Sequence, residues 1–197
     1  MEFSRSLVGL EYESSDYVSW HSSGIVVEHN GQKQIVTSAY ILGNRSWEEG
    51  ESLPVNVLLP NREKVPGIIT YIDEHYNVAI VSAELRETDA ASFDTNVFKL
   101  GDVVTAVGRR NELTIFPGKI NIRKDHLESD NLMSSSCSIN ESGIGGPLVS
   151  NSSGKVIGMN FFSRPRTPFM PSNVLLGCEN FIMRPSVRKL ALVNNRT

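Results

Sequence analysis

Short apolar runs separated by turn-forming residues are the feature that most constrains the fold of this 197-residue chain. The runs are five to ten residues long, and clusters of Asn, Gly, Pro and Ser lie between them. Runs of this length favour β-strands, and these four residue types are the ones that tight turns prefer. The pattern therefore predicts antiparallel β structure, with strands in the runs at residues 24–28, 34–42, 53–59, 67–72, 77–83, 102–108, 113–122 and 155–161.

The composition is typical of a globular protein. Forty per cent of the residues are hydrophobic and 21% are charged, which suits one globular unit with a sizeable core. The formal net charge of -3 argues against broad electrostatic binding to nucleic acid or to a membrane surface, so we expect neither partner.

Targeting and redox signals are sparse. No segment is expected to be a signal peptide, and the sequence has no apolar run of about 18 residues. It has two cysteines, Cys137 and Cys178, which do not make a disulfide framework. These features favour an intracellular location, cytoplasmic or nuclear, or an organelle if a targeting segment has been removed.

The segment ESGIGGPL at residues 141–148 carries the strongest motif. A strand, a polar turn and a second strand follow it at residues 147–150, 151–154 and 155–160. This arrangement resembles the active-site loop of the HtrA/Deg-like family of trypsin-fold (chymotrypsin-type) serine proteases. In that family a serine precedes two glycines, Pro and Leu, and Ile144 occupies the position of that serine.

Further segments are similar to the same family and occur in the same order. They are SGIVV at residues 23–27, IVTSAYIL at 35–42, NVAIV at 77–81, LGDVVTAVG at 100–108 and FIM at 181–183. The resemblance implies an all-β, trypsin-like fold of two six-stranded antiparallel β-barrels with a short C-terminal helix near residues 185–193. We expect the first barrel at about residues 1–88, the second at about 95–197, and no PDZ domain.

The resemblance also places the three members of the catalytic triad. Tyr40 stands at the position of the general-base histidine, Asn77 at the aspartate and Ile144 at the nucleophile. Tyrosine is a neutral donor near pH 7, asparagine carries no charge to stabilise a cationic base, and isoleucine has no lone pair. The three replacements predict that this site has no catalytic residue and no hydrolytic route.

A displaced pair of residues is the alternative. Ser142 lies two positions before Ile144, and His75 lies two positions before Asn77, so they could replace the lost nucleophile and base. An exposed loop is the simpler expectation for His75. Cys137 is expected to be a buried structural cysteine, because the sequence shows no cationic partner that would activate it.

Backbone donors do not depend on side-chain identity. The resemblance places an oxyanion hole at the N–H groups of Ser142 and Ile144, with Gly143 between them. If this turn is retained, it could bind a carbonyl or a carboxylate. If Ser142 in the place of a glycine disfavours the turn, the loop is collapsed instead.

A proline-rich segment between residues 160 and 171 gives a candidate partner surface. Arg164 and Arg166 are basic, and prolines flank Phe169 and Met170. The segment is either an apolar protrusion for a partner or a loop folded onto its own barrel.

Together these features predict a catalytically inactive serine-protease homologue, a pseudoprotease, that binds a protein or peptide as a scaffold or regulator. An active protease relative is one such partner, and a homo-oligomer is left open. The alternative is an HtrA/Deg-like serine endopeptidase with shifted catalytic residues. No metal and no cofactor are expected.

Overall fold

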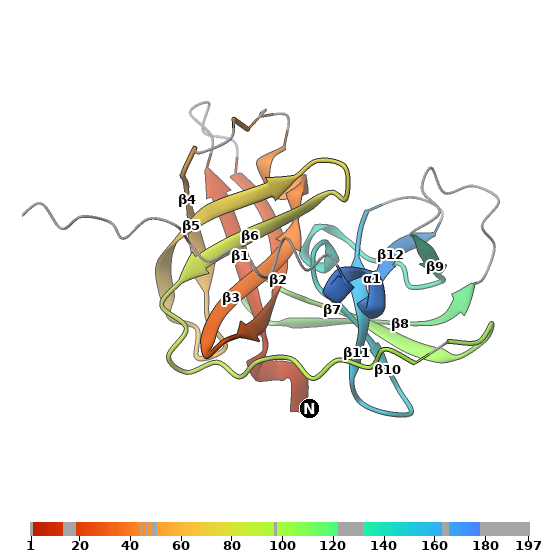
Figure 1. Ribbon diagram of the computed structural model, residues 1–197. Helices are drawn as coiled ribbons and strands as arrows, with labels where there is room; N and C mark the ends of the chain where they lie inside the picture. The colour runs from red at the N-terminus through yellow and green to blue at the C-terminus, as the bar shows by residue number, and fades with distance from the viewer. Residues whose placement is uncertain are drawn as a thin grey trace, which may run out of the picture.

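Two closed six-stranded antiparallel barrels form the computed structural model (Figure 1). It describes residues 2–13, 19–43, 45, 47–48, 51–96, 98–121, 132–162 and 166–177. The strand order is β1-β2-β3-β6-β5-β4 in the first barrel and β10-β11-β12-β9-β8-β7 in the second. The predicted all-β, two-barrel architecture is therefore confirmed.

The first barrel follows a short 3₁₀ helix, η1, at Glu2–Arg5, and a second 3₁₀ helix, η2 at Ala39–Leu42, follows its third strand. Side chains alternate along these strands, so that every second residue enters the barrel. The strands are β1 Leu7–Glu13, β2 Ser19–His29, β3 Gln32–Ser38, β4 Leu53–Leu58, β5 Lys64–Asp73 and β6 Val78–Ala83.

The second barrel contains the loop with the family-like motif. A 3₁₀ helix, η3 at Glu141–Gly143, begins this loop, and the helix α1 at Ser172–Gly177 follows the last strand. The strands are β7 Val103–Arg109, β8 Leu113–Asn121, β9 Met133–Ser135, β10 Pro147–Ser150, β11 Val156–Asn160 and β12 Thr167–Pro171.

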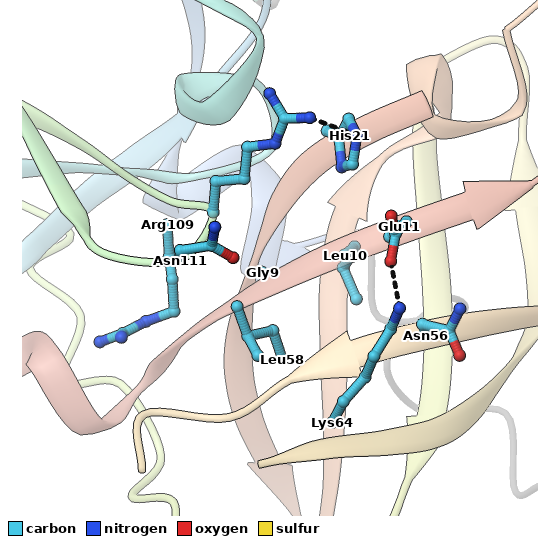
Figure 2. Close-up of a pocket in the computed structure, with 10 residues that line it drawn as sticks. Gly9, Leu10, Glu11, His21, Asn56, Leu58, Lys64, Arg109 and Asn111 are labelled. Carbon is cyan, nitrogen blue, oxygen red and sulfur yellow. Dashed lines mark hydrogen bonds and ion pairs between the residues drawn. The ribbon is translucent and has the colours of Figure 1, made fainter. Parts of the chain in front are cut away.

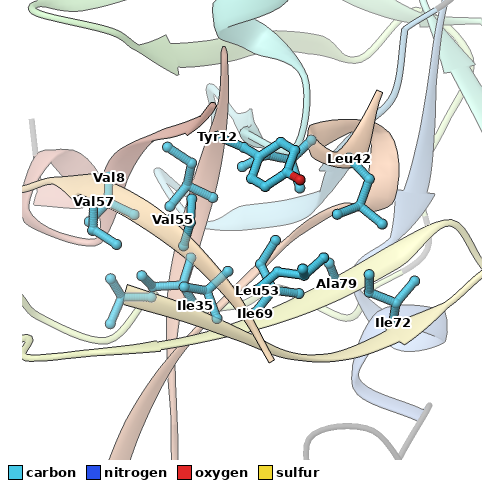
Figure 3. Packing of buried hydrophobic residues seen from close by; sticks show 14 of the residues in the cluster. Val8, Tyr12, Ile35, Leu42, Leu53, Val55, Val57, Ile69, Ile72 and Ala79 are labelled. Atoms are coloured by element: carbon cyan, nitrogen blue, oxygen red, sulfur yellow. The ribbon is translucent and has the colours of Figure 1, made fainter. Parts of the chain in front are cut away.

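Three hydrophobic clusters form the core of the structure. One fills the first barrel, with Ile35, Val55 and Ile69 near its centre (Figure 3). A smaller one, which includes Phe169, fills the second barrel. The third joins the barrels, because Ile25 of the first packs in the same cluster as Met159 of the second.

The strand predicted at residues 34–42 is too long at its C-terminal end. β3 ends at Ser38, whose hydroxyl accepts a hydrogen bond from the Tyr40 backbone N–H at 3.2 Å and so caps η2. Gly43 ends η2 with a φ of 60°, a conformation that favours glycine.

The regions outside the predicted strands also differ from expectation. Sequence patterning did not indicate β1, β9 or β12. The connector between the barrels is bound to both of them, through Ala91 N–H to the Val26 carbonyl and Asp94 N–H to the Val156 carbonyl, each at 2.8 Å. α1 is a short helix after the second barrel, and the helix predicted near residues 185–193 lies outside the described residues.

Candidate functional site

Tyr40 lies half-buried at the start of η2, in an aromatic group with Trp20 and Phe162. Its ring centroid is 5.6 Å from Trp20 in an edge-to-face contact and 6.5 Å from Phe162. Burial raises the pKa of the Tyr40 phenol above its usual value, and the Glu141 carboxylate raises it further. The phenol is therefore neutral at physiological pH and does not supply a general base.

Asn77 lies in the turn between β5 and β6, with a φ of 53° that asparagine tolerates better than most residues. Its backbone carbonyl accepts the Ala39 N–H at 3.1 Å, and its side-chain oxygen accepts the Ser38 hydroxyl at 3.4 Å. These bonds hold Asn77 against the two residues that precede Tyr40. The structure thus brings the two triad-equivalent positions of the first barrel together.

Ile144 is fully buried, in the turn that follows η3. Its carbonyl accepts the Ser23 N–H of β2 at 2.7 Å, which ties the turn to the first barrel. An apolar side chain with no solvent exposure offers no group to a substrate. Ile144, which the sequence resemblance assigned to the nucleophile position, is therefore a packing residue.

The backbone donors of this turn are used within the chain. Ser142 N–H donates to the Asn140 side-chain oxygen at 3.0 Å, and Gly143 N–H donates to the Asn140 carbonyl at 2.9 Å. Ile144 N–H donates to the Glu141 carbonyl at 3.1 Å. The turn is thus the collapsed alternative, because each N–H of the proposed oxyanion hole already has an acceptor.

Both barrels hold the turn in this form. The Ser23 hydroxyl donates to the Ser142 carbonyl at 2.6 Å and accepts from the Arg109 N–H at 2.7 Å. Gly108 of β7 allows this close approach, since a Cβ there would lie 2.2 Å from the Ser142 carbonyl oxygen. Moving the turn would leave several buried polar groups without partners, which is costly.

The displaced pair Ser142 and His75 is not assembled. The Ser142 hydroxyl donates to the Asn140 side-chain oxygen at 2.7 Å, and Ser142 is only 7% exposed. His75 is exposed in the turn between β5 and β6, with its ring edge-to-face against Tyr76. No hydrogen bond joins Ser142 to His75 in the part of the chain that the structure describes.

The prediction that Phe169 and Met170 form part of an exposed partner surface is wrong. Phe169 and Met170 belong to β12, and both are essentially fully buried. They are covered because Phe169 packs in the core of the second barrel and Met170 packs in the cluster that joins the two barrels. Arg166 is exposed, and Arg164 lies outside the described residues. Cys137 is buried, as predicted for a structural cysteine.

Sequence analysis missed a polar groove where the β7–β8 hairpin meets β1 (Figure 2). Its lining includes three cations, Lys64, Arg109 and Arg110, together with Glu11 and His21. The consecutive arginines at residues 109 and 110 could have drawn attention to a turn, but not to the strands that face it. A groove of this kind depends on contacts between the two barrels.

The described residues provide neither a metal-binding cluster nor a membrane-spanning helix. No group of three or more His, Cys, Asp or Glu residues that could hold a metal ion occurs within the described ranges. None of the helices in those ranges has the length and apolar character needed to span a membrane.

Comparison with known proteins agrees with the two-barrel fold. Residues 22–159 match the family model described as the trypsin-like peptidase domain, which is well over half of the chain. Comparison with curated proteins gives no significant match. In contrast, 585 solved chains match significantly, so the fold assignment does not depend on a single structure.

One solved structure similar to this chain is the serine endoprotease from Yersinia pestis, with a TM-score of 0.73. The sequence identity is 19%, and the match covers 91% of this chain and 63% of that one. This chain therefore spans less than two thirds of the length of that endoprotease. At this identity the similarity shows the shared fold alone.

Proposed function

Because this chain belongs to the trypsin-like peptidase domain family, we propose that it is a catalytically inactive member that acts by binding a protein or peptide, as a scaffold or regulator. The observation that carries this proposal is the set of residues at the triad positions. Tyr40, Asn77 and Ile144 together lack a nucleophile, a base that titrates near neutral pH and a charge that would stabilise such a base.

The closed turn supports the same proposal. Acyl transfer in this fold needs backbone donors aimed at the developing oxyanion, and removal of one donor alone slows catalysis by about a hundredfold or more. Here the N–H groups of Ser142 and Ile144 are bonded within the chain. A substrate would have to break these bonds before it could use either donor.

Binding is proposed because the chain retains the two-barrel fold of a peptidase family but lacks the side chains that hydrolysis requires. Both barrels close, and the cluster that joins them is fully packed. In this proposal the partner is a protein or peptide, and an active relative is one candidate.

The test is hydrolysis by the purified protein. We expect no casein cleavage above that of Ser142→Ala and His75→Ala variants, and no stoichiometric labelling by a serine-directed fluorophosphonate probe. Turnover that disappears in either variant would instead establish an endopeptidase with shifted catalytic residues. Equal residual turnover in all three preparations would be assigned to a contaminating protease and would leave the proposal standing.

A further inference from the structure

The floor of the groove is a row of polar side chains on the outer face of the first barrel. The strand register places Glu11 of β1 between His21 of β2 and Asn56 of β4. Directly opposed residues on neighbouring strands have their Cβ atoms about 5 Å apart. The neighbouring residues Leu10 and Tyr12 point into the barrel core, so Glu11 faces outward.

The wall of the groove is the β7–β8 hairpin of the second barrel. Gly9 lets this hairpin approach β1 closely, because a Cβ at that position would lie 2.9 Å from the Arg109 carbonyl oxygen and 3.2 Å from that of Arg110. The resulting cavity of about 210 Å³ is lined by both barrels. Glu11 and Lys64 face each other across its floor, with an ion-pair distance of 2.5 Å (Figure 2).

Arg110 forms no close ion pair with a described residue in this arrangement, and Glu11 acts on it only at longer range. Its guanidinium lies 2.8 Å from His21 Nε2, and since arginine is always a donor, Nε2 must accept and the proton of His21 lies on Nδ1. The imidazole is therefore neutral in this contact. Among the described residues no carboxylate forms an ion pair with Arg110.

Arg109 also lines the groove, but its guanidinium does not face Glu11 and Lys64 (Figure 2). It is only 6% exposed, and its guanidinium donates to the carbonyls of Leu7 at 2.9 Å and Ser4 at 3.0 Å. These backbone acceptors hold Arg109 in place, so Arg110 is the cation that a ligand in the groove would meet.

The charge of the groove is opposite in sign to that of the whole chain. Three cations, Lys64, Arg109 and Arg110, line it with the single carboxylate of Glu11, whereas the chain as a whole carries a net charge of -3. The forked guanidinium of Arg110 matches the geometry of a carboxylate. Asn56 and Asn111 supply amide groups that can bond to neighbouring peptide groups.

We infer that this groove binds an acidic side chain, aspartate or glutamate, of a peptide or protein partner. The inference rests on the proposed function for the existence of such a partner and adds its chemical class. The size of the cavity suits one side chain with its adjoining peptide groups. Nucleic acid would need a longer series of phosphate contacts, which the negative net charge disfavours.

The groove is close to the triad-equivalent positions. The Glu141 carboxylate raises the pKa of Tyr40 and also acts on His21, so it lies within electrostatic reach of both. Of the charges of Glu141 and Arg110, only that of Arg110 favours an acidic side chain.

The test is an NMR titration of the isotope-labelled protein, which detects weak binding. Four probes are used: an end-blocked octapeptide with two glutamates, its glutamine counterpart, the glutamine peptide with a free C-terminal carboxylate, and a DNA octamer. We expect the glutamate peptide to shift the amide signals of Gly9, Asn56 and Asn111 saturably. We also expect it to bind about tenfold more tightly than the glutamine peptide, since charge-assisted bonds are the strong ones.

Variants locate the site. Arg110→Gln should weaken binding of the glutamate peptide about tenfold, and Arg110→Lys should weaken it less, because the charge is kept and the fork is lost. Arg86→Gln is the matched control, since Arg86 is exposed and pairs with Glu84 outside the groove, and it should change the affinity less than twofold. Thermal unfolding of each variant checks that it is folded.

Several outcomes would overturn the inference. They are equal binding of the glutamate and glutamine peptides, binding only of the peptide with the free terminus, equal binding of the DNA octamer, and equal effects of Arg110→Gln and Arg86→Gln. Peptide binding that does not depend on Arg110 would remove this groove but leave the proposed function intact. The proposed function fails separately, through catalytic turnover.

Discussion

The turn around Ile144 and the groove beside Arg110 are connected by hydrogen bonds. They differ in whether their polar groups are paired within the chain. In the turn, the N–H groups of Ser142, Gly143 and Ile144 all donate to acceptors within the chain. In the groove, the Arg110 guanidinium bonds to His21 and forms no ion pair with a carboxylate among the described residues. The N–H groups of the turn are therefore not free to bind a ligand, whereas the positive charge of Arg110 in the groove can be neutralised by an anionic ligand.

Ser23 is the point where the two regions meet. Its hydroxyl bonds to the Ser142 carbonyl on one side and accepts the Arg109 N–H on the other. The comparison teaches that resemblance to a family motif does not by itself leave polar groups free to bind a ligand. Internal satisfaction of polar groups decides whether they are free, because a group that is already paired gains little from a ligand.

The largest expected effect comes from breaking the packed turn. Ile144→Ser should lower the free energy of unfolding by about 3 kcal/mol, because it leaves a cavity and buries a hydroxyl. It should not create peptidase activity, because Tyr40 supplies no base. Urea unfolding and casein cleavage measure the two effects.

The control for this variant is Ile115→Ser. Ile115 is 44% exposed, so its replacement should cost much less than that of the fully buried Ile144. Equal losses of stability in the two variants would contradict the packing role of Ile144.

The next prediction concerns Ser23, whose hydrogen bonds connect the turn to the groove. Ser23→Ala should lower the free energy of unfolding by about 2 kcal/mol, because the Ser142 carbonyl and the Arg109 N–H both lose a buried partner. The exposed Ser152→Ala, which also loses a hydroxyl contact, should cost less than about 0.5 kcal/mol. Chemical denaturation of both variants would show whether burial makes this difference.

A smaller effect is expected when the carboxylate of the groove is removed. Glu11→Gln should strengthen binding of the glutamate peptide about threefold, because Lys64 loses its internal carboxylate and can pair with the ligand. Glu28→Gln removes the same charge from an exposed position that does not line the groove, and it should change the affinity little. Weaker binding by Glu11→Gln would argue that Glu11 orients the site instead of competing for it.

The smallest effect concerns the protonation of His21. Burial lowers its pKa and Arg110 lowers it further, while Glu11 and Glu141 raise it and Lys64 lowers it slightly. Arg110→Gln should therefore raise the pKa of His21, as measured from the pH dependence of its imidazole NMR signals. An unchanged midpoint, equal to that in Arg86→Gln, would contradict the contact between His21 and Arg110.

The sign of the linked stability follows from this direction. Because the pKa of His21 is lower in the folded state, the unfolded chain takes up the proton first, at about pH 6.5. The stabilisation is present above that pH and is lost as the pH falls through the folded pKa. A His21→Gln variant should show a weaker loss of stability on acidification.

Much of the fold could be predicted from local patterning, and its failures have local causes. The runs that became β4, β5, β7 and β11 were found because alternating or continuous apolar residues are visible within a few positions. β12 was missed because its residues, Thr167–Pro171, contain two prolines, which normally indicate a loop. The cores nevertheless bury Phe169 within the second barrel and Met170 between the barrels.

The candidate site divides in the same way. By itself the sequence predicted that Tyr40, Asn77 and Ile144 stand at the triad positions of the family, because a motif and its order are properties of the linear chain. Only the tertiary structure decided that the donors around Ile144 bond within the chain, while Arg110 forms no ion pair with a described acid. The physical reason is that a hydrogen bond or an ion pair depends on distances between residues such as Ser23 and Ser142, which are 119 positions apart and meet only after both barrels have closed.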